Sequence, residues 1–273
     1  MLIVFLVMAG ILTILDPLGC RSNTETTHNG AAGSSQVTGA GAGTSTGGAA
    51  IPAELPTPIM AQSAGVDLHC AVSMSDLTEV LIHNASYAYA CEITTELEEA
   101  TNTEVIAKHG TGRNKAAQPT GDQWMTGEFI RCYRDGNAGP TMSAIDCGAP
   151  VGATVYAPVS GTVVLVKEYK LYGEYDDIQV HIQPEGRSDL DVVLIHLTDA
   201  SVKAGDTVVA GVTPIARIRD VFEYIGDSMQ LMQYTAEGDN GNHTHIAVNN
   251  VADPEYHGLD EIKPAASSSA APA

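Results

Sequence analysis

The chain has 273 residues, with 13 Lys and Arg against 33 Asp and Glu, and its formal net charge is -20 at pH 7. This length fits one ordinary domain with appendages, or two small domains. A charge this negative repels nucleic acid and anionic membrane surfaces, which argues against both as partners. Aromatic residues make up only 5% of the sequence, so the core must be mainly aliphatic.

The N-terminus carries an export signal. Residues 1–15 form an apolar run that has the length of a signal-peptide core and is short for a membrane span. The following Leu18, Gly19 and Cys20 are similar to the lipobox of bacterial lipoproteins, although Pro17 stands where that motif usually has Leu. We expect an extracytoplasmic protein of the bacterial cell surface or periplasm, with Cys20 lipidated as its anchor.

The next segment is a tether. Residues 21–57 are nearly all Gly, Ala, Ser and Thr, which bury too little apolar surface to offset the entropy of ordering. Such a segment acts as a flexible linker. The sequence thus predicts five parts: a signal region at 1–20, a linker at 21–57, a small α+β region at 58–128, a mainly β domain at 129–253 and a tail at 254–273.

Four cysteines follow the signal region. An even number in an exported chain predicts two disulfides, with three possible connectivities. Proximity in the sequence favours Cys70–Cys91 and Cys132–Cys147. The alternative is that Cys147 is a thiolate ligand of a metal ion.

The region 58–128 has a mixed pattern. Apolar residues alternate over 66–74 and 87–93, which predicts strands, and the Glu-rich residues 95–107 predict a helix. His69, His83 and His109 have no second type of ligand at a useful spacing. We interpret all three as structural or solvated.

From residue 129 the chain is a succession of short strands separated by turn signals, which predicts a mainly β fold. Residues 192–197 are apolar on both faces, as in a buried central strand, so His196 is anomalous there. In the strand predicted at 243–248, His243 and His245 share one face, about 7 Å apart. This pair is half of a metal or acid–base site, or else a polar strand end.

Five blocks, in order, resemble the lysostaphin/LytM-type zinc endopeptidases. They are Ala-Ile-Asp at 144–146, Gly-Ala-Thr-Val-Tyr-Ala-Pro at 152–158 with Gly-Thr-Val at 161–163, Ile-His-Leu at 195–197, Val-Lys-Ala-Gly-Asp at 202–206 and His-Thr-His at 243–245. The resemblance covers residues 133–251. It implies a compact antiparallel β domain, similar to a hybrid barrel or sandwich, with a metal in a groove. It also implies cleavage of peptide bridges or stem peptides of bacterial peptidoglycan.

The resemblance also implies roles for individual residues. Asp146 and His245 match zinc ligands, while His196 and His243 match the histidines that handle protons and steady the attacking water and the oxyanion. The remaining ligand position is occupied by Met142, and a thioether is a weak ligand for zinc. The resemblance therefore implies weak zinc binding, which Met142→His would strengthen.

Three functions stay open at this point. The first is a zinc metallo-endopeptidase with an altered site. The second, which Met142 favours slightly, is a degenerate, non-catalytic domain that binds peptidoglycan or regulates a cell-wall hydrolase. The third is a lipoyl- or biotinyl-type carrier domain, which the missing Lys at a hairpin tip disfavours.

Overall fold

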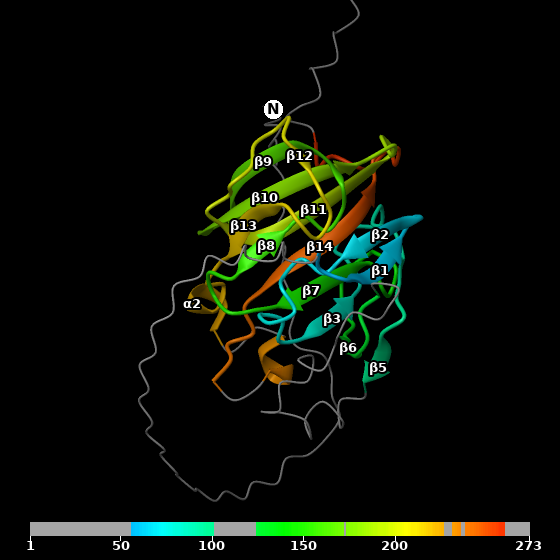
Figure 1. The fold of residues 1–273 in the computed structure, drawn as a ribbon. Helices are drawn as coiled ribbons and strands as arrows, with labels where there is room; N and C mark the ends of the chain where they lie inside the picture. The colour runs from blue at the N-terminus through cyan, green and yellow to red at the C-terminus, as the bar shows by residue number, and fades with distance from the viewer. Residues whose placement is uncertain (1–55, 101–123, 172, 227–230, 236–237, 260–273) are drawn as a thin grey trace, which may run out of the picture.

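The computed structural model describes residues 56–100, 124–171, 173–226, 231–235 and 238–259 (Figure 1). This part of the chain is mainly β and largely antiparallel, which confirms the predicted fold class. The signal region with Cys20, nearly all of the linker and most of the tail lie outside the described residues. None of the helices that the structure describes is long and apolar enough to span a membrane.

One large sheet organises the fold. Its strands follow the open order β12-β9-β10-β11-β14-β7-β3-β6-β5, and β13 joins β8 to β11 beside this path. Neighbours are antiparallel except for the pairs β3–β6 and β5–β6, which are parallel. The bounds are β3 (Val80–His83), β5 (Glu98–Ala100), β6 (Glu128–Arg131), β7 (Ala144–Gly148), β8 (Thr154–Tyr156), β9 (Gly161–Leu171), β10 (Tyr175–Pro184), β11 (Leu190–Thr198), β12 (Thr207–Val208), β13 (Pro214–Ile218) and β14 (His243–Asn250).

A smaller sheet with the order β2-β1-β4 packs on the large one. It consists of β1 (Ile59–Ser63), β2 (Val66–His69) and β4 (Ile93–Thr94). Side chains of both sheets share one core, in which Met60 and Leu68 meet residues such as Ile145 and Val192. The largest fully buried side chains of the described residues are all Leu, Ile or Met, as the low aromatic content predicted.

Region 58–128 differs from the prediction. Its strands β3, β5 and β6 extend the large sheet, on the β7 side. The helix predicted at 95–107 is wrong for residues 95–100, which form a bend and strand β5, and residues 101–107 lie outside the described part. Parallel pairing of β5 with β6 outweighs the local helix preference of the Glu residues.

Residues 87–89 form a turn, not the predicted strand. Tyr87 stacks on Tyr89 with ring centroids 4.9 Å apart, and Tyr89 meets the edge of Tyr256. The alternating tyrosines therefore pack against each other and against the C-terminal segment. Only Ile93, at the end of the predicted stretch, enters a strand, β4.

Neither predicted disulfide is formed. Cys70, Cys91 and Cys147 are free thiols, which excludes Cys70–Cys91 and Cys132–Cys147. Cys147 lies in the core and donates to the sulfur of Met60 at 3.6 Å, and it is absent from the group of potential metal ligands among the described residues. Proximity in the sequence failed because the strand pairing carries these cysteines to different neighbours.

The cysteine arrangement predicts the pattern of thiol labelling. Cys70 and Cys147 are fully buried, whereas Cys91 is partly exposed. A maleimide should therefore modify Cys91 in the native protein and reach Cys70 and Cys147 only after denaturation, as peptide mass spectrometry can show. A denatured, unreduced sample in which Cys70 and Cys91 resist labelling would restore the sequence-based pairing.

Candidate metal centre

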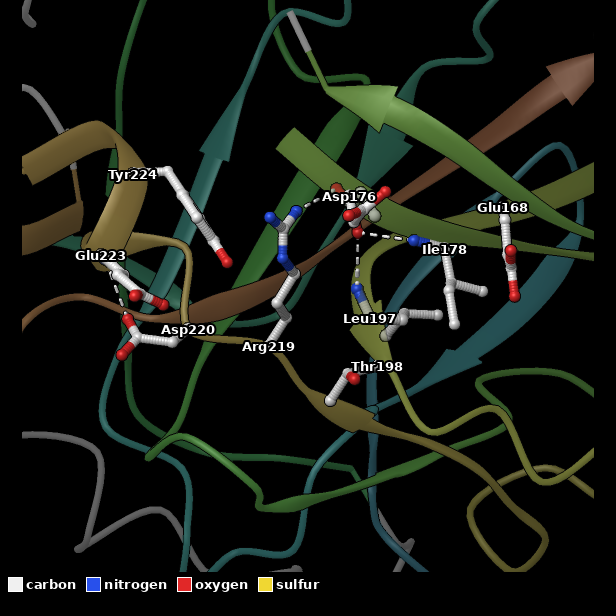
Figure 2. Close-up of a pocket in the computed structure, with 10 residues that line it drawn as sticks. Glu168, Asp176, Ile178, Leu197, Thr198, Arg219, Asp220, Glu223 and Tyr224 are labelled. Atoms are coloured by element: carbon white, nitrogen blue, oxygen red, sulfur yellow. Dashed lines mark hydrogen bonds and ion pairs between the residues drawn. The ribbon is translucent and has the colours of Figure 1, made fainter. Parts of the chain in front are cut away.

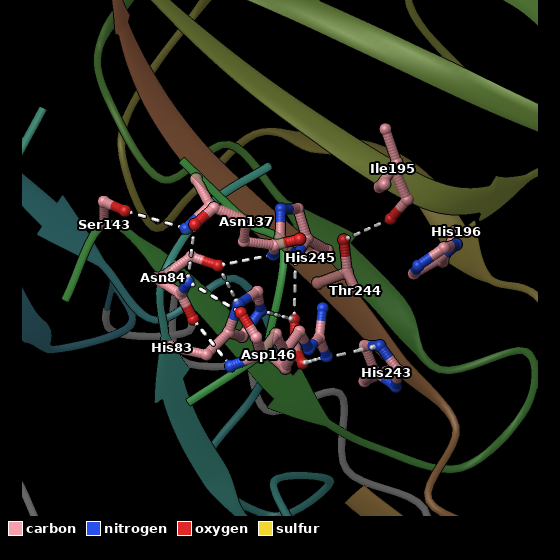
Figure 3. Close-up of polar contacts among 12 residues, drawn as sticks. His83, Asn84, Asn137, Ser143, Asp146, Ile195, His196, His243, Thr244 and His245 are labelled. Carbon is pink, nitrogen blue, oxygen red and sulfur yellow. Dashed lines mark hydrogen bonds and ion pairs between the residues drawn. The ribbon is translucent and has the colours of Figure 1, made fainter. Parts of the chain in front are cut away.

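Strand register gathers the polar side chains on one face of the large sheet (Figure 3). On β7, Asp146 lies opposite His245 of β14 and opposite Leu81 of β3, and His83 lies opposite Ala144. Because side chains alternate in a strand, His83, Asp146, His243 and His245 share one face. The other face of these strands contributes to the main core, for example through Ile82, Ile145 and Ile246.

His196 joins this group through a β-bulge. Between Ile178 and Val180 of β10, the partners on β11 advance by three residues, from Leu197 to Leu194. His196 lies in this bulge with φ at 66°, a left-handed conformation that few residues other than Gly adopt. A bulge redirects a side chain. The His196 ring lies with its centroid 5.1 Å from that of His243 and 6.4 Å from that of His245. His196, His243 and His245, to which the resemblance gives roles at one site, therefore lie close together in the fold.

Three side chains form a potential metal site. One donor atom each of His83, Asp146 and His245 lies within 4.8 Å of the other two. Nδ1 of His245 is 2.8 Å and Nε2 of His83 is 3.4 Å from Oδ1 of Asp146. Nδ1 of His83 donates to the carbonyl of Asn84 at 2.8 Å, which leaves the Nε2 lone pair free for a cation. Two imidazoles and a carboxylate are a donor set that suits zinc.

His83 is the residue that the sequence analysis missed. Its side chain is 1% exposed and faces Asp146, so the solvated interpretation is wrong. Met142, which stands at the ligand position of the enzymes that the sequence resembles, packs against the main core instead. The only signal in the sequence was a polar residue ending the apolar run Val80 to Ile82. The pairing of β3 with β7, which brings His83 to the site, has no local signature.

Arg134 also contacts the central carboxylate. Its Nη2 donates to Oδ2 of Asp146 at 3.1 Å. The Asn84 side chain positions the Arg134 backbone, since Oδ1 accepts the Arg134 N–H at 2.8 Å and Nδ2 donates to its carbonyl at 3.0 Å. Burial raises the pKa of Asp146, but His243, His83, Arg134 and the hydrogen bond from His245 outweigh it and hold that pKa well below its usual range.

A second carboxylate holds His196. Oδ2 of Asp177 accepts from Nδ1 of His196 at 2.9 Å and from the Tyr169 hydroxyl at 2.8 Å. Oδ1 accepts the backbone N–H groups of Ile178 and Leu197. Burial raises the pKa of Asp177, but these hydrogen bonds and His196 bring it below the usual value. With Nδ1 occupied, Nε2 is the nitrogen of His196 that can serve a ligand.

His243 has a similar arrangement. Its Nδ1 donates to the carbonyl of Gly241 at 2.8 Å, and its Nε2 is 3.8 Å from Oδ2 of Asp146. Burial is the main cause that lowers the pKa of His243 to about 4, so the imidazole is neutral at pH 7. With its one N–H donated to Gly241, neutral His243 can accept a proton or a hydrogen bond at Nε2 beside the potential metal site.

No protein-family model matches the chain, and no curated protein does. Solved structures similar to it include a mutant catalytic domain of the prophage-encoded M23 protein EnpA of Enterococcus faecalis, with 20% identity over 43% of this chain and 73% of that one, at a TM-score of 0.29. A zinc-containing peptidase of Vibrio cholerae has 23% identity over 40% of this chain and 26% of its own, at 0.27. A chain of the pore-forming complex of SpoIIQ with SpoIIIAH has 26% identity over 39% of this chain and 56% of its own, at a TM-score of 0.26.

The buried histidines predict acid sensitivity of the metal-free protein. The pKa values of His243 and His245 fall from 6.5 to about 4, mainly through burial. Between these pH values the unfolded chain binds more protons than the folded one. The free energy of unfolding should therefore drop as the pH falls through this window, by up to about 3 kcal/mol per histidine. Urea unfolding with chelator at pH 7 and pH 4.5 measures the effect.

The variant His243→Asn is the matched test, because it removes one of the two titrating groups. Its free energy of unfolding should depend less on pH between 6.5 and 4 than that of the wild type. An unchanged pH dependence would contradict the assignment of a neutral, buried His243.

Proposed function

We propose that the chain is a zinc-dependent endopeptidase of the LytM type, with His83, Asp146 and His245 as metal ligands and peptides of the bacterial cell wall as substrates. The observation that carries the proposal is the meeting of three donor atoms within 4.8 Å, with one histidine contributed by β3. Three protein ligands leave a position for water or substrate, as a catalytic zinc site requires. The substrate class follows from the resemblance in sequence.

The residues around the site have complementary tasks. Zinc, when bound, supplies a Lewis acid that polarises a carbonyl group and lowers the pKa of water to about 7. His196, held through Nδ1 by Asp177, presents Nε2 to accept and return a proton. His243, whose Nδ1 donates to the Gly241 carbonyl, presents the Nε2 lone pair, which would accept a hydrogen bond from the attacking water.

The second candidate is a non-catalytic domain that binds peptidoglycan or regulates a hydrolase. Arg134 favours it, because its guanidinium lies 3.1 Å from Asp146 and its positive charge opposes that of a metal ion. In the first candidate the same contact orients Asp146, so that Oδ2 binds Arg134 while Oδ1 is left for the metal. Zinc content and hydrolysis separate the two.

Location fits either candidate. We place the protein outside the cytoplasm, tethered through Cys20 and the linker at 21–57, because residues 1–20 combine an apolar run with a lipobox-like end. From there the domain reaches peptidoglycan or a cell-wall hydrolase as its partner.

The ligand set predicts zinc content. Wild type should bind an equimolar amount of zinc by elemental analysis. His83→Ala should weaken zinc affinity by on the order of 100-fold or more, since changes outside the ligand shell alone cost 10- to 100-fold. Met142→Leu is the control and should retain zinc. Met142→His should add no affinity, because residue 142 packs on the core. Wild-type affinity in His83→Ala would refute the ligand assignment.

The hydrogen bond between Asp177 and His196 predicts how substitutions of these two residues change the peptidase activity. Asp177→Asn should lower kcat on cell-wall peptides by on the order of 10²- to 10⁴-fold, the usual worth of a proton-transfer group, with zinc content unchanged. His196→Ala should cost about as much, and the double variant little more, because the two act as one unit. New amino termini released from purified peptidoglycan measure cleavage.

A matched control is available for these variants. His181 and Asp191 form another buried pair, with Nδ1 and Oδ2 2.8 Å apart, so Asp191→Asn removes a similar carboxylate outside the site. The Asp191→Asn variant should have the same kcat as the wild type, measured per folded molecule. Stoichiometric zinc without new amino termini in the wild type would reject the enzyme and favour the non-catalytic candidate.

A further inference from the structure

A hollow is lined in part by Asp177, the carboxylate that also holds His196. Figure 2 shows the residues that line it. It has a volume of about 480 Å³ and is bounded by β10, the end of β11 and the segment that leads into α2 (Phe222–Ile225). Its lining is unusual in charge, because one arginine is surrounded by five carboxylates. The residues that line it are Glu168, Asp176, Asp177, Ile178, Leu197, Thr198, Arg219, Asp220, Glu223 and Tyr224.

Arg219 forms part of the wall, and its two Nη groups lack hydrogen-bond partners. The residue is only 7% exposed, yet neither Nη1 nor Nη2 makes a hydrogen bond. The nearest carboxylate oxygen, Oδ2 of Asp177, is 3.6 Å from Nη1, which balances charge without a hydrogen bond. The Tyr224 ring lies against the guanidinium, 4.6 Å from its carbon to the ring centroid.

Leaving a buried guanidinium without acceptors costs free energy, because its N–H groups lose the hydrogen bonds they make with water. The planar fork of two Nη groups matches the two oxygens of a carboxylate. Tyr224 holds the fork in place from one side, as Figure 2 shows. A ligand carboxylate that enters the hollow would supply the missing acceptors.

The rim excludes a ligand that carries a carboxylate alone. Glu168, Asp176 and Glu223 are exposed, and Asp220 is partly so. Lys170 pairs with Asp176 and balances its charge. The carboxylates of Glu168, Asp220 and Glu223 still make the electrostatic potential at the entrance negative. A simple anion would be repelled there, whereas an ammonium group would be attracted. The lining therefore complements a ligand that carries both charges, with its carboxylate inside the hollow and its ammonium group at the rim.

We propose that this hollow binds a zwitterionic amino-acid head group, with its carboxylate on Arg219 and its ammonium among the rim carboxylates. In combination with the proposed function, on which this part rests, the head group belongs to a side chain of the peptide substrate that carries both an ammonium and a carboxylate. The hollow then acts as a specificity site.

Two contacts connect the hollow to the metal centre. Asp177 lies between them, because Oδ2 accepts from His196 on one side and faces Arg219 on the other. Oδ1 of Asn242, the residue before β14, accepts the N–H groups of Val221 and Phe222 at the start of α2. The wall that carries Tyr224 is thus fixed to the strand that carries His243 and His245.

The test uses three probes of similar length on zinc-chelated full-length protein. They are 2-aminohexanoic acid, which carries both charges, hexanoic acid, which lacks the amine, and pentylamine, which lacks the carboxylate. Calorimetry and NMR titration of the amides at 219–224 should show saturable binding of 2-aminohexanoic acid. Each singly charged probe should bind at least about tenfold more weakly.

Variants assign the two charges. Arg219→Met should reduce the affinity for 2-aminohexanoic acid to that for pentylamine, and Glu223→Gln, on the exposed rim, should weaken its binding severalfold. Glu185→Gln is the control, because Glu185 is an exposed carboxylate outside the lining, and it should bind all probes as wild type does. His245→Ala, which removes a proposed zinc ligand, should still bind 2-aminohexanoic acid, so failure of the zinc proposal is seen separately.

Several results overturn the inference. The inference is overturned if 2-aminohexanoic acid does not bind the wild type. It is also overturned if Arg219→Met binds 2-aminohexanoic acid as tightly as the wild type does. Equal affinity for pentylamine would make the hollow a cation site, and equal affinity for hexanoic acid would make it an anion site. The comparison of probes on the wild type decides these cases even if Arg219→Met fails to fold.

Discussion

The site depends on one fully buried carboxylate. Asp146 has no exposed surface, and an isolated buried charge of this kind costs several kcal/mol unless cations and hydrogen-bond donors surround it. Those partners come from separate parts of the chain: His83 from β3, His245 from β14 and Arg134 from the segment after β6. A metal ion at the same place would use the negative charge that the fold already holds there.

Asp177, on β10, is a second buried carboxylate that several hydrogen-bond donors surround. It fixes the bulged end of β11 through the Leu197 N–H and sets the orientation of His196, and it also faces Arg219. One carboxylate therefore links a strained backbone position, a proton-handling side chain and a separate hollow. The left-handed conformation of His196 costs about 1–3 kcal/mol, which these contacts offset.

The position of a ligand is set in space and not by its spacing in the chain. Met142 lies four residues before Asp146, where the enzymes that the sequence resembles have a histidine, but its side chain packs on the core. His83 is 63 residues from Asp146 and reaches it because β3 pairs with β7. Region 58–128 is therefore part of the site, since one of its strands carries a potential ligand.

The sequence by itself determined the features that depend on neighbouring residues. Alternation with a period of two made the chain mainly β, and it put His243 and His245 on one face, because the pleat of a strand is a local property. The ordered blocks also pointed to Asp146 and His196 as members of one site. Only the tertiary structure decided which strands pair, where β11 bulges and which cysteines meet. These depend on the packing of segments far apart in the chain, so Arg134 and Asp177 had no signal that a single sequence could show. His83 showed only as a polar residue at the end of an apolar run.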